Sequence, residues 1–346
     1  MLQRLISTGK SLLSITPLLV VVLLATSEVN GQKAVKSLDP LQVPEGYGFQ
    51  EFGIELSSIT KMDGHLYALS EKCKLLYKMS IEGSVTIDEV IFLGNEAEWK
   101  DPVAIEAVAV YGDWLIMTDE GVERDPRKSS KIYAYNTKSN PPRLMELVVD
   151  SEIFKGWNGN YGAEGIAVNS KQKKLYVLRE KVEDASSSEL ITFDLVTDGA
   201  SVSLEKPRQN TIRFSTGSGR FSDLMYSADE NSLYLLEVNH NKNEISSSEY
   251  RITTLPLGGD GYVGAEKAEE LVDFSDKLLI QTLKDGVDSP SDDEEDYAIS
   301  TNIEGLYRVR ENEFMLVSDN ATASKCGDTH LGETGVFRLR LADKKN

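Results

Sequence analysis

The stretch GAEGIAVNSKQKKLYVLRE, residues 162–180, holds two short apolar runs joined by a polar turn, with an acid at each end of the pair. The runs GIAV and LYVL have the length and composition of the two strands of a hairpin. Because antiparallel pairing places the start of one strand beside the end of the next, Glu164 and Glu180 are expected at the same end of the hairpin. The stretch therefore predicts a buried strand pair with carboxylates gathered at one end.

The same pattern occurs four more times along the chain, at 53–71, 105–120, 221–237 and 302–320. In each copy a Ser or Glu begins the first strand, and the second strand follows about ten residues later. The aligned head residues are separated by 49, 58, 58 and 82 positions: Ser57, Glu106, Glu164, Ser222 and Glu304. The second strands end at tail residues Glu71, Asp119, Glu180, Glu237 and Asp319. Repeats of about 50 residues indicate a modular architecture.

Two further strand-like runs follow each hairpin, and no long amphipathic helix interrupts them, so we predict an all-β propeller of five four-stranded blades. The fifth repeat stops after three strands, at GVFRLRL, and the N-terminal segment AVKSLDPL is expected to supply the fourth and close the ring. A sixth blade is the alternative. The 82-residue spacing before Glu304 is explained better by an acidic loop insertion at 284–301.

Residues 1–31 have the layout of a signal peptide, with two basic residues before an apolar stretch of about 14 residues. That stretch is shorter than the roughly 20 residues that span a bilayer, so a retained membrane anchor is the lesser alternative. Residues 32–346 are then a single secreted, extracellular domain. Cleavage changes the net charge from −19 to −20, a surface that disfavours nucleic acid and anionic membranes and is compatible with cations.

The chain has two cysteines, which follow the second strands of the first and last repeats. First and last blades are neighbours in a closed ring, so a Cys73–Cys326 disulfide is expected in an exported protein. Asn320 begins the sequon Asn-Ala-Thr and is a candidate glycosylation site.

The five head residues begin the innermost strands and are expected to converge on the central channel. Three carboxylates without a counter-ion would repel one another, whereas oxygen ligands without His or thiolate suit calcium. The predicted Ca²⁺ ligands are Ser57, Glu106, Glu164, Ser222 and Glu304. Asp223 is the alternative to Ser222, and solvated rim acids are the alternative to a metal site. The tail residues allow two interpretations, a wider ring at the same mouth or caps of exposed turns.

The segments NIEGLYRVRENEFMLVSDN, GAEGIAVNSKQKKLYVLRE, FSDLMYSADENSLYLLE and DPVAIEAVAV resemble the motifs of phytase-like proteins, which are described by an esterase-like activity of phytase. The order of the five head residues is also similar to the axial calcium ligands of soluble calcium-activated nucleotidases, or apyrases. That resemblance implies a five-bladed propeller with calcium on its axis.

Two functions fit these features. In the first, the protein is an extracellular binding or matrix protein with structural calcium and an unknown small molecule or partner at the channel mouth. In the second, it is a calcium-dependent hydrolase of phosphate or carboxylic esters, with Glu180 or Asp319 as general base. Its weakness is the small number of basic residues near the predicted mouth, Arg179, Lys181 and Arg220.

Overall fold

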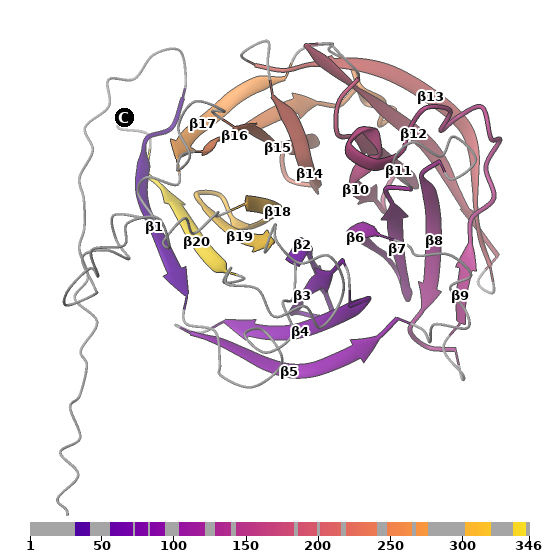
Figure 1. Cartoon of the computed structure of the whole chain (residues 1–346), viewed down its shortest axis with the longest axis horizontal. Helices are drawn as coiled ribbons and strands as arrows, with labels where there is room; N and C mark the ends of the chain where they lie inside the picture. The colour runs from indigo at the N-terminus through magenta and orange to yellow at the C-terminus, as the bar shows by residue number, and fades with distance from the viewer. Residues whose placement is uncertain are drawn as a thin grey trace, which may run out of the picture.

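A computed structural model of the chain describes residues 32–41, 56–71, 73–81, 84–93, 104–121, 129–139, 143–182, 186–198, 201–215, 219–240, 248–264, 268–275, 302–319 and 335–343. These residues form five four-stranded antiparallel sheets around a central axis (Figure 1). The predicted five-bladed propeller is confirmed. Within the described ranges the one helical element is a short 3₁₀ turn, Gly159–Tyr161, and no helix there is long and apolar enough to cross a membrane.

Each blade runs outward from its innermost strand. Blade 1 contains β2 (Leu56–Met62), β3 (His65–Ser70), β4 (Leu75–Ile81) and β5 (Val85–Phe92). Blade 2 contains β6 (Ile105–Tyr111), β7 (Trp114–Asp119), β8 (Lys131–Asn136) and β9 (Arg143–Glu146). Blade 3 contains β10 (Ala163–Asn169), β11 (Lys174–Arg179), β12 (Ser187–Thr197) and β13 (Val202–Arg213). Blade 4 contains β14 (Arg220–Ser227), β15 (Ser232–His240), β16 (Ser248–Pro256) and β17 (Glu269–Ser275).

Blade 5 joins the two ends of the chain. It contains β18 (Asn302–Arg310), β19 (Glu313–Asp319) and β20 (Val336–Leu341), and β1 (Val35–Leu41) forms its outer strand. The β1–β20 pairing is antiparallel, with Leu38 opposite Leu339 (Figure 1). The expected closure by AVKSLDPL is confirmed. Pro40 is tolerated in β1 because an outer strand does not need every N–H in a ladder.

The outer strand of blade 3 begins earlier than the sequence indicates. The run NTIRF predicts a strand that starts near residue 210, but β13 begins at Val202. The polar stretch with Pro207 reads as a loop, whereas β13 is an exposed outer strand and pairs along almost its whole length with β12. An outer strand accepts a proline and polar side chains that an inner strand would not.

The core is divided among the five interfaces between blades. Each of the five hydrophobic clusters combines buried residues of two adjacent blades, for example Trp114 and Ile116 with Val177 and Phe193 between blades 2 and 3. Full burial of one such side chain stabilises the fold by about 1.5–3 kcal/mol. Both faces of every sheet are therefore used for packing, and the inner strands present their free edge to the axis.

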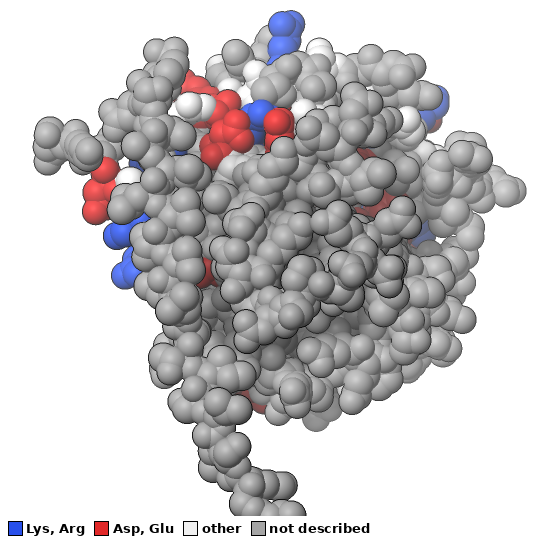
Figure 2. Space-filling model, turned by 60° about the vertical axis from the view of Figure 1, so that its left-hand side comes forward, with Lys and Arg blue, Asp and Glu red and all other residues white. Residues whose placement is uncertain are grey.

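The two ends of the ring differ. All five inner strands begin at one end, here called the entry end, and turn back at the other, here called the turn end. At the turn end the inner hairpins close within two to four residues, as at Asp63–Gly64. Connections between blades and between the second and third strands all begin and end at the entry end, and long connections of this kind commonly carry function. Figure 2 shows one face on which described acidic side chains lie close together beside basic ones.

Candidate metal centre

The five head residues lie at β-bulges. In every inner hairpin the pairing register skips one residue near the start of the first strand, for example between Leu56 and Ser58. The skipped residues are Ser57, Glu106, Glu164, Ser222 and Glu304. All five are buried, with no more than 6% of their surface exposed. A bulge adds a residue that the partner strand does not match and redirects its side chain.

The bulge shows in the packing of its neighbours. Ile105 and Val108, three residues apart, both pack between blades 1 and 2, whereas Ala107 and Ala109 pack between blades 2 and 3. Strict alternation would place Ile105 and Val108 on opposite faces of the strand. Glu106 is thus the extra residue that belongs to neither packed face.

The glycine that follows a head glutamate is explained by close packing. A Cβ on Gly165 would lie 2.8 Å from Leu224 Cβ, and one on Gly305 would lie 2.3 Å from Val317 Cγ2 and 3.0 Å from Ser58 Cα. A larger side chain at either of these two glycines would displace the neighbouring strand, whereas blades 1, 2 and 4 accommodate Ser58, Ala107 and Asp223 at this position. In each Glu-Gly pair, the glutamate is therefore the bulged acid, and the glycine allows the neighbouring inner strands to lie close together.

Asp223 occupies the equivalent position in blade 4, and its side chain links blade 4 to blade 5. Its carboxylate accepts hydrogen bonds from the N–H groups of Leu306 and Leu224, each at 2.7 Å. Ser222 is the bulged residue, and its hydroxyl donates to the carbonyl of Ile303 at 3.4 Å. Ser57 likewise donates to the carbonyl of Ile105 at 3.2 Å. Both serine hydroxyls therefore bridge to the next blade, and only their lone pairs remain for a cation.

Arg220 is the basic residue that contacts the acids of the entry end. Its guanidinium lies 3.3 Å from Glu180 Oε1 and 2.9 Å from Glu304 Oε1, and it donates to Asn302 Oδ1 at 2.9 Å. Asn302 Nδ2 in turn donates to Glu304 Oε1 at 2.6 Å. Arg220 thereby joins blades 3, 4 and 5 and compensates two of the predicted site acids.

A group of acids also lies at the entry end. Carboxylate oxygens of Glu71, Glu106 and Glu120 all lie within 4.8 Å of one another. Burial raises the pKa of Glu106 well above its usual range, and the charges of Glu164 and Glu120 and a hydrogen bond to Glu120 raise it further. Burial also raises the pKa of Glu164, and the charges of Glu180 and Glu120 raise it further. Deprotonating this group without a counter-ion is unfavourable, and a bound cation would reverse that.

Glu120 is the residue that the sequence did not reveal. It follows Asp119, which fitted the tail pattern but accepts the N–H of Gly121 at 2.9 Å and so caps its own turn. The Glu120 carbonyl accepts the Ser130 hydroxyl at 2.9 Å, and a Cβ on Gly162 would lie 2.3 Å from that carbonyl oxygen. Two contacts distant in sequence therefore hold Glu120.

The remaining tail residues divide between the two interpretations. Glu71 and Glu180 take part in the groups described above, whereas Glu237 accepts the N–H of Ser215 at 2.9 Å. Glu180 Oε2 is buried without a hydrogen-bond partner among the described residues, and burial raises the pKa of Glu180 to about 7 against the opposing charge of Arg220. The Asp319 side chain, Cys326 and Asn320 lie outside the described residues, as do the segments 1–31 and 284–301.

Two of the basic residues noted near the entry end are engaged. Arg179 donates to the carbonyls of Tyr161 at 2.8 Å and Gly156 at 2.5 Å and pairs with Glu189 at 2.7 Å. Arg220 contacts Glu180, Glu304 and Asn302, as described above. Lys181 Nζ lies 5.6 Å from the centre of the Tyr161 ring. The described entry end therefore offers carboxylates in excess of free cations.

This donor set fits a hard cation. Carboxylate oxygens from three chain segments, without His or thiolate, are the ligands that calcium prefers, and calcium tolerates an incomplete protein shell completed by water. The burial and mutual repulsion that raise the pKa of Glu106, and the unpartnered oxygen of Glu180, are properties of a site that favours a cation. Among the described residues, the group Glu71, Glu106 and Glu120 is thus the best candidate for a cation site.

Comparison with known proteins matches residues 32–321 to the family described as Phytase-like: Esterase-like activity of phytase. None of the curated proteins compared with the chain matches it. Among solved structures, the PQQ-bound aldose sugar dehydrogenase of Streptomyces coelicolor is similar with 12% identity and a TM-score of 0.40, over 88% of this chain and 98% of that chain. The GH43 endo-arabinanase of Bacillus licheniformis has 13% identity and a TM-score of 0.45, over 84% of this chain and 94% of that chain.

Proposed function

Because the chain belongs to the phytase-like family, we propose that it is an exported, calcium-dependent hydrolase of ester bonds whose site is the entry end of the propeller. The observation that carries this proposal is the group Glu71, Glu106 and Glu120, with oxygens within 4.8 Å of one another, beside an acid that retains an unpartnered oxygen, Glu180. A cation site next to a buried base is the arrangement that metal-assisted hydrolysis needs.

The roles follow from the contacts. Glu71, Glu106 and Glu120 would hold calcium, and Glu164 would add an oxygen from blade 3. A bound calcium ion would supply polarisation of an ester oxygen. Arg220 holds Glu180 through Oε1 and leaves Oε2 without a hydrogen-bond partner, so Oε2 would be the atom that accepts a proton in hydrolysis. Asn302 and Arg220 together fix Glu304, which makes Glu304 a positioning residue in this arrangement.

A second candidate function is non-catalytic binding of an extracellular small molecule or partner, with calcium as a structural ion. One observation favours it: Arg179 and Arg220, which could clamp a phosphate, are already engaged within the described structure. A bidentate arginine clamp is the usual way to recognise phosphate.

Calcium binding is tested first, by thermal unfolding of the mature protein with calcium or chelator. A ligand at 100 times its Kd stabilises the native state by about 2.7 kcal/mol, so a clear rise in Tm is expected. Glu106→Gln should remove most of this rise, whereas Glu304→Gln should weaken it less because Glu304 is bound to Arg220. Asp229→Asn, in an exposed turn, is the matched control and should respond as the wild type does.

Catalysis is tested separately with nitrophenyl esters, phytate and nucleotides, each with and without chelator. Chelator-sensitive turnover that Glu180→Gln abolishes, while the calcium-induced rise in Tm persists, supports the hydrolase. A full calcium response without turnover of any substrate supports the binding function instead. No calcium response at all would refute both. N-terminal sequencing of secreted protein checks export and cleavage near residue 31.

A further inference from the structure

The guanidinium of Arg220 is held by side-chain oxygens of two neighbouring blades. It lies 2.9 Å from Glu304 Oε1 and 2.9 Å from Asn302 Oδ1 in blade 5, and 3.3 Å from Glu180 Oε1 at the end of β11 in blade 3. All three partners are buried, with no more than 8% of their surface exposed. Glu180 also has a buried Oε2 without a hydrogen-bond partner among the described residues. Two carboxylates and an amide oxygen therefore surround one positive group.

The atoms around this guanidinium are also the ligands that calcium prefers. Calcium takes six to eight oxygens from carboxylates, amide carbonyls and water, at about 2.3–2.6 Å. The three oxygens that contact Arg220 lie at 2.9–3.3 Å, so a contraction of less than about 1 Å would bring them to calcium distance. Two carboxylates also match the charge of a divalent ion, whereas the guanidinium compensates only one of them.

The positive charge of Arg220 belongs to the chain itself. Arginine stays protonated throughout the physiological pH range. Burial opposes the charged form of Arg220, but the charges of Glu304, Glu180 and Glu164 raise its pKa above the usual range. Because the side chain is anchored at the first residue of β14, neither chelator nor dilution can remove it. Blades 3, 4 and 5 are therefore joined by a cation that is always present.

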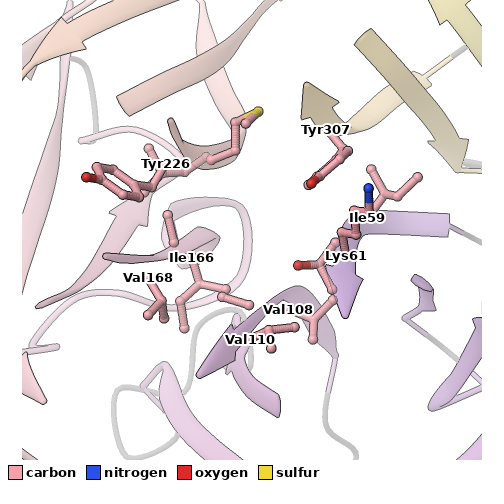
Figure 3. A pocket seen from close by; sticks show the side chains of 13 residues that line it. Ile59, Lys61, Val108, Val110, Ile166, Val168, Tyr226 and Tyr307 are labelled. Carbon is pink, nitrogen blue, oxygen red and sulfur yellow. The ribbon is translucent and has the colours of Figure 1, made fainter. Parts of the chain in front are cut away.

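The cavity at the turn end offers no comparable position for a cation. It has a volume of about 160 Å³ and is lined by all five inner strands, and its lining residues include Lys61 but no Asp or Glu (Figure 3). The described acids whose oxygens are grouped closely enough to hold a metal are Glu71, Glu106 and Glu120, which the proposed function already uses. Among the described residues, an ion gained on loss of Arg220 would therefore lie among the oxygens that now surround its guanidinium.

We propose that Arg220 occupies a calcium-type oxygen site formed by Glu180, Glu304 and Asn302, and thereby limits the entry end to one bound calcium ion. Loss of the side chain opens this site to a second ion, with water completing the coordination shell. Excluding that ion leaves Glu180 available as the proposed base, because a bound cation would lower its proton affinity. The single ion of the wild type rests on the proposed function, whereas a difference of one ion between variant and wild type does not.

Equilibrium dialysis of the full-length mature protein against about 1 mM calcium, within the range that extracellular modules bind, counts the bound ions. Arg220→Ala should bind one calcium ion more per chain than the wild type and should show a larger calcium-induced rise in Tm. Arg220→Lys keeps a positive charge and should bind the same number of ions as the wild type. Arg340→Met, which removes a more exposed arginine of blade 5, is the control and should also match the wild type.

Two double variants assign the gained ion. Glu106→Gln combined with Arg220→Ala should still bind one ion, which separates this site from the proposed calcium group. Glu304→Gln combined with Arg220→Ala should lose the gained ion. Absence of calcium from the wild type alone would count against the proposed function and leave this comparison intact. Equal ion counts in Arg220→Ala and the wild type, or an Arg220→Ala protein that stays unfolded in calcium, would overturn the proposal.

Discussion

Replacing Arg220 with Met tests how the acids of the entry end are compensated. The side chain is only 14% exposed and contacts Glu180, Glu304 and Asn302 at 3.3, 2.9 and 2.9 Å. Methionine fills a similar volume but leaves two buried carboxylates without a counter-charge. Removing one partner of a buried ion pair costs about 3–5 kcal/mol, so we expect Arg220→Met to lower the free energy of unfolding by that amount at pH 8 without divalent cations.

Urea denaturation measures this loss, and Arg340→Met is the matched control. Arg340 pairs with Asp39 at 2.9 Å and with Glu313 at 3.5 Å but is 35% exposed, and Glu313 keeps Arg310 and Arg338 as partners, so replacing Arg340 should cost about 0–1 kcal/mol. If uncompensated charge causes the loss, adding Glu180→Gln and Glu304→Gln to Arg220→Met should recover most of it, and calcium should stabilise Arg220→Met more than the wild type. A loss below 1 kcal/mol, or no recovery in the triple variant, would refute the reasoning.

Three further predictions concern packing, pH and covalent structure. Gly305→Ala should destabilise the fold by about 1–3 kcal/mol, because its methyl group would lie 2.3 Å from Val317 Cγ2, whereas Gly259→Ala, with nothing within 4 Å of the added methyl, should have little effect; urea midpoints of both check this. Burial raises the pKa of Asp119 to about 7, so the folded protein retains a proton that the unfolded chain releases above about pH 4, and stability in chelator should fall as the pH rises from about 4 to 7. Asp119→Asn should remove up to about 4 kcal/mol of that fall, and the same slope in wild type and variant would contradict the assignment. Peptide mapping of the non-reduced protein should find the predicted disulfide, and two free thiols after export would argue against it.

The fold was predictable because every repeat carries its own local signal. Each hairpin has the same spacing between its head residue and its second strand, which reflects the bulge, and a glycine follows the head where the inner strands approach closely, at Gly165 and Gly305. Ring closure was also predictable, since a three-stranded last repeat leaves one strand position vacant. The start of β13 was not, because Pro207 and its polar neighbours have the composition of a loop.

The site was predictable only in part. The head positions followed from spacing, and all five are buried at bulges, but the calcium ligand set itself stays a prediction. Glu120 was missed because Ser130 and Gly162, distant in sequence, hold it in place. The division of the acids by Arg220 also depends on contacts across three blades. Strand periodicity carries no information about such contacts.

The pairing of β1 with β20 means that blade 5 can be completed only at the end of biosynthesis. The ion pair between Asp39 and Arg340 spans 301 positions, so the outer strand of blade 5 leaves the ribosome long before its partner exists. At synthesis rates of about 5–20 residues per second, β1 waits roughly 15–60 s with its hydrogen-bonding edges unpaired. Blades 1 to 4 have all their strands by the time residue 275 is made, whereas blade 5 can form only after the last strand is released. An unpaired strand edge can associate with other chains. The N-terminal strand β1 is therefore exposed to such association for about the whole period of translation, until β20 is made.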